Sequence, residues 1–354
     1  MNSLEAYLFN LAIFAAINAI TVIGLNLQFG TAGLLNLAYI VLVAVGAYAT
    51  GIASLHPAAA LHSHYISYIG GFGWQFPWNL LFGIVVTVAV GLLLGIIVFS
   101  RVSLWYMAVA LVSIGYAFLT IINDVPSLFN GYIGLSNVAM PFQGVLSGGA
   151  DQFAFLAICI AGVALVLGLA WRLERAPIGR VWRAIREDEV GAQALGKRAF
   201  TFRLSAFALG SAAAGLAGGL TVMYLGSWNT EAWQPNETFL IFAALIVGGR
   251  GWSMGGVLGS LLVYDALIDG SKYIPVVGHQ LQLLPFLQAV FLAAGVMAML
   301  WWRPYGLWPE PKDRVPKPLW AGHGMERAAP TAAAEQPPAV EPVVELQHPT
   351  GVER

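Results

Sequence analysis

The chain has 354 residues, of which 58% are hydrophobic and 10% are charged, and its formal net charge at pH 7 is −1. With a mean hydropathy of +0.73, it has too little polar surface to cover a water-soluble globule of this size, so composition predicts an integral membrane protein. Its one cysteine, Cys159, excludes a disulfide framework and a thiolate metal site, and the chain lacks the basic stripe that nucleic acid requires.

Apolar segments follow one another along the chain, separated by short polar or glycine-rich breaks. No positive charge precedes the first segment, so we expect a retained helix and not a cleaved signal peptide. The predicted spans are 5–29, 34–54, 77–100, 103–122, 152–171, 204–226, 238–247, a segment that ends near 267, and 284–302. The sequence therefore predicts an all-α polytopic bundle of about 8–10 transmembrane helices.

The loop from His56 to Phe76 contains three of the six histidines, His56, His62 and His64. A zinc site needs a fourth ligand that nothing nearby supplies, and the spacing of these histidines matches no standard motif. We interpret the loop as solvated and expect no metal site.

The predicted span 204–226 is crowded with glycine, alanine and serine, including Gly215. Small residues let helix backbones approach closely in a membrane, where packing contacts hold helices together. This helix is predicted to lie at the centre of the bundle, with Val222 facing lipid.

The only long polar interruption runs from Trp171 to Arg203 and is rich in arginine and lysine. Apolar residues recur in it at helical spacing, and charged residues occupy the other faces. The apolar stripe consists of Ile178, Val181, Trp182 and Ile185, and the charged positions are Arg180, Arg183, Arg186 and Glu187. Such an amphipathic helix either lies on an anionic membrane surface or occupies a groove of a partner protein, and the pattern alone leaves both open.

Gly191 to Lys197 copies the first seven positions of a phosphate-binding loop, GxxxxGK. Arg198 replaces the serine or threonine that would reach Mg²⁺, and no strand precedes the motif. We interpret the match as a coincidence. The chain is expected to bind no cofactor of its own, so that any use of ATP falls to a partner.

The distribution of positive charge predicts the orientation, because cytoplasmic loops collect Lys and Arg. An N-terminus outside and a C-terminus inside places Arg101, the central segment, Arg250 and the tail in the cytoplasm, and leaves only Lys272 outside. The alanine-, proline- and glutamate-rich tail cannot bury a core. We therefore expect a membrane domain at 1–310, which includes a cytoplasmic segment at 172–203, and a disordered cytoplasmic tail at 311–354.

Three separated stretches resemble the M-type permease subunits of branched-chain amino-acid ABC importers. Gly30-Thr-Ala-Gly33-Leu-Leu-Asn36, followed by Gly46-Ala-Tyr, is similar to the early glycine pattern of that family. Arg183-Ala-Ile-Arg186-Glu187-Asp-Glu189, which runs on to Gly196, resembles its cytoplasmic segment. Gly248-Gly249-Arg250-Gly251, with the later Arg303-Pro304-Tyr-Gly306-Leu307, resembles its closing motifs. The three stretches occur in the family's order.

The resemblance implies an ABC importer permease fold in the inner membrane and a function in amino-acid uptake. The implied partners are a second homologous permease, two ATPase subunits, an extracytoplasmic binding protein and membrane lipid, but no nucleic acid. The residues implied to contact the ATPase are Arg180, Arg183, Arg186, Glu187, Glu189 and Gly196. Those implied in translocation or helix packing are Gly30, Gly33, Asn36, Gly46, Gly215, Gly248, Gly249, Arg250 and Gly251.

Several alternatives stay open. Arg250 is either an interfacial arginine that extends to the headgroups or a gate residue, and Asp265 faces either the pathway or the headgroups. A urea or short-amide importer would share the same motifs. An ion-coupled secondary transporter usually shows internal repeats around a midplane ion site, and the pattern of 30–48 has no second copy. An enzyme is not expected, because no span carries a convergent His, Asp or Ser set.

Overall fold

The computed structural model describes residues 3–57, 68, 70–103, 106–126, 130–143, 150–235, 237–264, 284–303, 306–308 and 310. All of them belong to one compact unit, Met1–Pro311. The predicted disordered tail at 311–354, the side chains of His62 and His64, and Asp265 and Lys272 lie outside the described residues.

The described residues form helices almost throughout, as the all-α prediction requires, and the helices agree closely with the predicted spans. They are α1 (Ser3–Leu25), η1 (Asn26–Thr31), α2 (Tyr39–Ser54), α3 (Trp78–Arg101), α4 (Met107–Asp124), η3 (Gly131–Ile133), α6 (Ala150–Arg175), α7 (Pro177–Glu187), α8 (Glu189–Ala194), α9 (Ala199–Leu225), η4 (Thr230–Trp233), α10 (Glu237–Gly248), α11 (Ser253–Ser260) and α12 (Leu284–Trp302).

Two of these elements are interrupted helices. The last turn of α1 widens into the π-helix η1, after which the chain leaves the helix and restarts at α2. Helices α10 and α11 bend by 116° at the glycine-arginine turn and form a broken span or a re-entrant loop. Within the described ranges, five helices are long and apolar enough to cross a membrane, or six if the bent pair counts as one span. Helix α2 is shorter than a full span, and so is the apolar stretch Ala289–Trp302 of α12.

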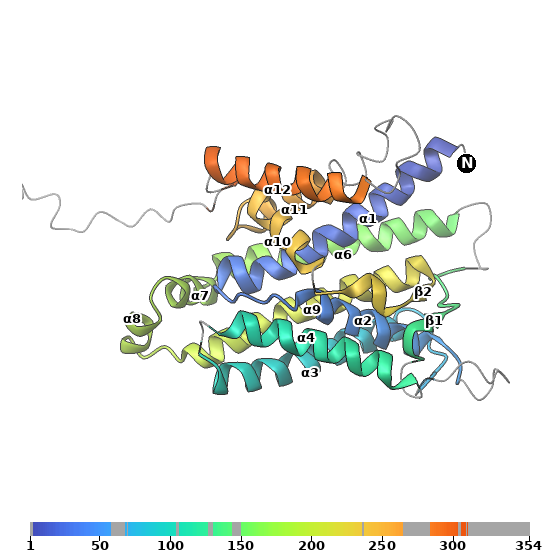
Figure 1. Cartoon of the computed structure of the whole chain (residues 1–354), viewed down its shortest axis with the longest axis horizontal. Helices are drawn as coiled ribbons and strands as arrows, with labels where there is room; N and C mark the ends of the chain where they lie inside the picture. Colours follow the sequence, from blue (N-terminus) through green and yellow to red (C-terminus); the bar gives the residue numbers. More distant parts are fainter. Residues whose placement is uncertain are drawn as a thin grey trace, which may run out of the picture. The chain divides into compact units, whose positions relative to one another are not determined.

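Helix α9 lies at the centre of the bundle, as its small residues predict, and packs against α1, α2 and α3 (Figure 1). At its crossing with α2, a Cβ atom on Gly46 would lie 2.5 Å from the Cα of Gly215, and one on Gly218 would lie 2.0 Å from the carbonyl oxygen of Val43. Val222 is fully buried, so the prediction that it faces lipid is wrong. Its position follows from the same crowding, because α9 is covered on nearly every side.

The two ends of the bundle differ in the segments that adjoin α9. The α7–α8 segment precedes the first residue of α9. Strand β2 (Ser227–Trp228) follows its last residue and pairs with β1 (Leu135–Ser136) in a two-stranded antiparallel ribbon. A 27-residue helix is about 40 Å long, so the ribbon and the α7–α8 segment occupy opposite ends (Figure 1).

Helix α1 runs parallel to α6. Phe9 packs edge-on against Phe153 at the starts of the two helices, with ring centroids 4.3 Å apart. Asn26 donates to Glu174 near their ends. The N-terminus therefore lies at the ribbon end of the bundle, away from α7 and α8 (Figure 1).

Replacing Gly215 with Leu is expected to force α9 away from α3, because even a Cβ atom there would lie 2.8 Å from the Thr87 hydroxyl and 3.0 Å from the Cα of Ile84. Overpacking of this kind costs roughly 1–3 kcal/mol or more, so the yield of folded, monodisperse protein in detergent should fall. Gly168→Leu is the matched control, because Gly168 is exposed on α6 and no atom lies within 4 Å of its Cβ position. Equal yields of the two variants would contradict the close crossing.

Candidate functional site

Helices α7 and α8 each begin at a residue that favours the first turn of a helix. Pro177 occupies the first turn of α7, a position whose N–H has no partner in the helix. Asp188 caps α8, and its Oδ1 accepts a hydrogen bond from the N–H of Gly191 at 3.0 Å. Trp182 is fully buried, and its indole N–H donates to the carbonyl of Phe202 at 2.9 Å. The predicted apolar stripe thus fastens α7 to the beginning of α9.

The turn at the end of this segment presents apolar side chains to its surroundings. Val190 is 78% exposed and Leu195 is 82% exposed. Gly196 follows with a φ of +77°, a conformation that favours glycine. Of the predicted coupling residues, Gly196, Arg180 and Glu187 are exposed. A compact, rigidly held turn with uncovered apolar side chains is suited to insertion into a groove of another protein.

Arg183 and Arg186 point into the protein, and both pair with a carboxylate of this chain. Arg183 Nη1 lies 3.4 Å from Glu310 Oε1, and Arg186 Nη2 lies 3.0 Å from Glu310 Oε2. Arg186 also donates to the backbone carbonyl of Gly30 and lies 3.5 Å from the exposed Glu187. The cause is long-range packing, because the C-terminal segment brings a carboxylate to the inner face of α7.

Glu189 is likewise engaged within the chain. Arg203 donates to both of its carboxylate oxygens, at 2.7 and 2.6 Å, in the bidentate geometry that makes such pairs strong. The pair joins the start of α8 to α9. Charge reversal at Glu189 would therefore break the ion pair with Arg203 inside the chain. For this reason Glu189 is a poor probe of contact with a partner.

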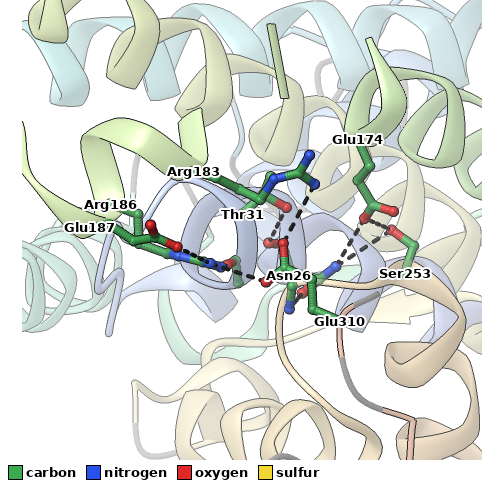
Figure 2. Close-up of polar contacts among 10 residues, drawn as sticks. Asn26, Thr31, Glu174, Arg183, Arg186, Glu187, Ser253 and Glu310 are labelled. Carbon is green, nitrogen blue, oxygen red and sulfur yellow. Dashed lines mark hydrogen bonds and ion pairs between the residues drawn. The ribbon is translucent and has the colours of Figure 1, made fainter. Parts of the chain in front are cut away.

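A buried polar cluster lies beneath α7, at the meeting point of η1, the end of α6 and the start of α11 (Figure 2). Asn26, Glu174 and Ser253 are each at most 1% exposed. Ser253 donates to Glu174 Oε1 at 2.5 Å, and the Asn26 amide donates to the same oxygen at 3.3 Å. Asn26 Oδ1 accepts from the N–H of Gly251 at 2.9 Å. The cluster holds together the ends of α1 and α6 and the beginning of α11.

The predicted packing glycines divide between three places. Gly30, Gly33 and Gly251 surround Arg186, and a Cβ on Gly33 would lie 2.7 Å from its Cγ. Gly46 and Gly215 meet at the crossing of α2 with α9 described above. Gly248 and Gly249 form the turn between α10 and α11, where a Cβ on Gly248 would lie 2.0 Å from the carbonyl oxygen of Gly255.

The remaining two predicted residues lie apart from these glycines. Asn36 is buried and donates to Gln28 at 2.9 Å, while its Oδ1 accepts the N–H of Ala38. Gln28 in turn donates to the carbonyl of Phe207. This chain of contacts fixes the break after η1 to α9. Arg250 is exposed at the tip of the turn, which agrees with an interfacial arginine.

Sequence reasoning missed Asn26, Glu174, Ser253 and Glu310. Glu174 and Asn26 carried a usable signal, since a carboxylate at the end of one apolar span and an amide inside another need partners in a membrane. Ser253 and Glu310 gave none, because a serine after a glycine turn and a glutamate after the last span are ordinary.

The comparisons with known proteins point to one family. Residues 7–300 match the family described as branched-chain amino acid transport system / permease component. The chain is 28% identical to the high-affinity branched-chain amino acid transport system permease protein LivM of Salmonella typhimurium, over 86% of this chain and 71% of that protein. The LivM protein of Escherichia coli gives the same identity and coverage. A probable branched-chain amino acid transport permease protein LivM of Methanocaldococcus jannaschii is 27% identical over 81% of this chain and 89% of its own length. No solved structure matches.

Asn26→Ala is expected to destabilise the junction of α1, α6 and α11, because it leaves the N–H of Gly251 without its acceptor and removes one donor to Glu174. A buried group left without a partner costs about 1–3 kcal/mol. Unfolding of the purified protein in detergent measures the loss. Ser113→Ala is the control, since this exposed hydroxyl bonds only the carbonyl of Val109 in its own helix. A loss no larger than that of the control would show that the junction contributes little to stability.

Proposed function

The chain belongs to the branched-chain amino acid transport permease family, and we propose that it is the membrane-spanning permease subunit of an ABC importer. It moves a branched-chain or related neutral amino acid into the cell by alternating access. ATP binding and hydrolysis take place on separate ATPase subunits, and this chain is not itself an enzyme. The relatives named LivM support the substrate class.

The observation that carries the proposal is the exposed turn of α8, with Val190 and Leu195 uncovered at its surface. The turn is fastened to the bundle by the Trp182 contact with α9 and by the Glu189–Arg203 pair. A groove on an ATPase subunit that gripped this turn would therefore move α7 and α9 with it. Closure of the ATPase dimer would in this way reorient the transmembrane helices.

The complete transporter contains a second homologous permease, two ATPase subunits and an extracytoplasmic binding protein, embedded in membrane lipid. One copy of this chain supplies one coupling turn, and an ATPase dimer requires two. The binding protein selects the substrate before it reaches the permease. The protein lies in the inner membrane.

The α7–α8 segment faces the cytoplasm, and the N-terminus faces outward. The parallel course of α1 and α6 supports this orientation, because it separates the N-terminus from α7. The positive charge of Arg180, Arg183 and Arg186 at the α7 end also favours it. The contacts of Arg183 and Arg186 with Glu310 bring the chain after α12 to the α7 end, which supports a cytoplasmic C-terminus.

Leu195→Asp is expected to weaken association with the ATPase subunit at least tenfold, because it places a charge in the apolar contact, while membrane insertion stays normal. Pull-down of the ATPase at equal permease levels in detergent measures the effect. Leu195→Met is the matched control, since it keeps an apolar side chain of similar volume. Recovery of equal ATPase by both variants would remove the α8 turn from the contact.

Uptake of radiolabelled leucine into proteoliposomes tests the function itself. The complete complex with its binding protein is expected to accumulate leucine only when ATP reaches the ATPase subunits. Uptake by the permease alone under an ion gradient would contradict the proposal and favour a secondary transporter. Accumulation of urea in place of any neutral amino acid would retain the transport mechanism and overturn the substrate class.

The orientation is testable because the only cysteine, Cys159, is fully buried. In a Cys159→Ala background, Tyr132→Cys should react in intact cells with a maleimide that cannot cross the membrane, because Tyr132 is 74% exposed at the ribbon end. Leu195→Cys should react only after the cells are opened. The reverse pattern would invert the assigned orientation.

A further inference from the structure

The chain after α12 folds back onto the turn between α10 and α11. The N–H of Leu307 donates to the carbonyl of Val247 at 3.0 Å, and the N–H of Trp308 donates to the carbonyl of Gly248 at 2.9 Å. Gly306 approaches the turn so closely that a Cβ atom on it would lie 2.4 Å from the Cα of Gly249. We call Gly306, Leu307, Trp308 and Glu310 the C-terminal strap.

The last strap residue, Glu310, reaches the inner face of α7. Its two carboxylate oxygens are divided between two arginines, Oε1 lying 3.4 Å from Arg183 and Oε2 lying 3.0 Å from Arg186 (Figure 2). All three side chains are only 17–22% exposed, so solvent screens the contact weakly. The Glu310 carboxylate thus neutralises part of the positive charge of Arg183 and Arg186, which would otherwise repel each other.

The strap spans two elements that differ in function. Helix α7 packs mainly on α6, α8, α9 and η1, and belongs to the segment that the ATPase would grip. The α10–α11 turn is the bent, glycine-rich element of the broken span. The fit is tight at the point of contact, since a Cβ on Gly251 would lie 2.5 Å from Glu310 Oε2 and 3.2 Å from Arg186 Nη1.

We propose that Glu310 is a positioning residue for energy coupling, which ties the coupling helix α7 to the α10–α11 turn so that both move together during the transport cycle. The inference rests on the proposed function as an ABC importer permease. With Glu310 in place, displacement of α7 by the ATPase pulls the strap and, through its two backbone hydrogen bonds, the turn. Without this carboxylate, α7 follows the ATPase and the turn lags behind. The ATPase subunits then hydrolyse ATP with less transport for each cycle.

The test measures the number of ATP molecules hydrolysed per leucine transported by the purified complete transporter in proteoliposomes. Glu310→Gln is expected to raise this ratio at least threefold, and Glu310→Asp to return it toward the wild-type value. The matched control is Glu231→Gln, which removes an exposed carboxylate of η4 at the ribbon end of the bundle, away from α7 and the strap. Its ratio should stay within twofold of wild type.

The ratio separates positioning from mere stability, because a purely structural loss lowers the amount of assembled complex and leaves the ratio of the assembled fraction unchanged. An unchanged ratio in assembled Glu310→Gln would overturn the inference, and so would equal shifts in Glu310→Gln and Glu231→Gln. A wild-type complex without ATP-dependent uptake would instead overturn the proposed function, before any variant is compared.

A second variant keeps the test decisive if Glu310→Gln fails to assemble. In the Cys159→Ala background, Arg183→Cys with Glu310→Cys is joined by a flexible bis-maleimide linker, which restores the tie without charge. The linked transporter is expected to show a low ratio of ATP to leucine, and the unlinked transporter a high one. Equal ratios before and after linking would reject the positioning role. Failure of this variant to assemble as well, while Glu231→Gln assembles normally, would also reject it.

Discussion

Interrupted helices inside a membrane are held together by the need to satisfy the backbone groups that each interruption sets free. Lipid offers no hydrogen bonds, so such groups must find partners within the protein. The break after η1 exposes the carbonyl of Gly30, which Arg186 satisfies. The turn after α10 exposes the N–H of Gly251, which Asn26 satisfies from η1. Each break is thus completed by groups from another segment, and neither arrangement is stable alone.

This mutual dependence explains why Asn26, Glu174 and Ser253 gather at the α7 end of the bundle. Glu174 is tolerated at full burial because Asn26 and Ser253 donate to one of its oxygens. The centre of the bundle is held together differently, because it lacks side chains at the contact. There α9 meets α2 through backbone contact at Gly46 and Gly215. The bundle is therefore closely packed at its middle and hydrogen-bonded at its α7 end.

The sequence predicted the helices well, because apolar length and glycine-marked breaks determine where a chain can cross a membrane. It also predicted the central place of α9 and the buried face of α7, both of which follow from residue size and helical period. It did not reveal the internal partners of Arg183, Arg186 and Glu189, which are separated from these residues by 14 to 127 positions along the chain. A local pattern shows that these side chains are charged, but the direction in which they point depends on how distant segments pack. Val222 was misplaced for the same reason, since its helix has almost no lipid-facing side.

The contact between Arg186 and Glu310 joins residues that lie 124 positions apart. At about 5–20 residues per second, a ribosome needs roughly 6–25 s to synthesise that interval. During this time α7 has already emerged, but its two inward arginines still lack their carboxylate. The contact between α7 and the C-terminal strap therefore forms only near the end of translation. A chain that stops early would insert most of its helices into the membrane and yet present an α7 that is not fastened to the rest of the bundle.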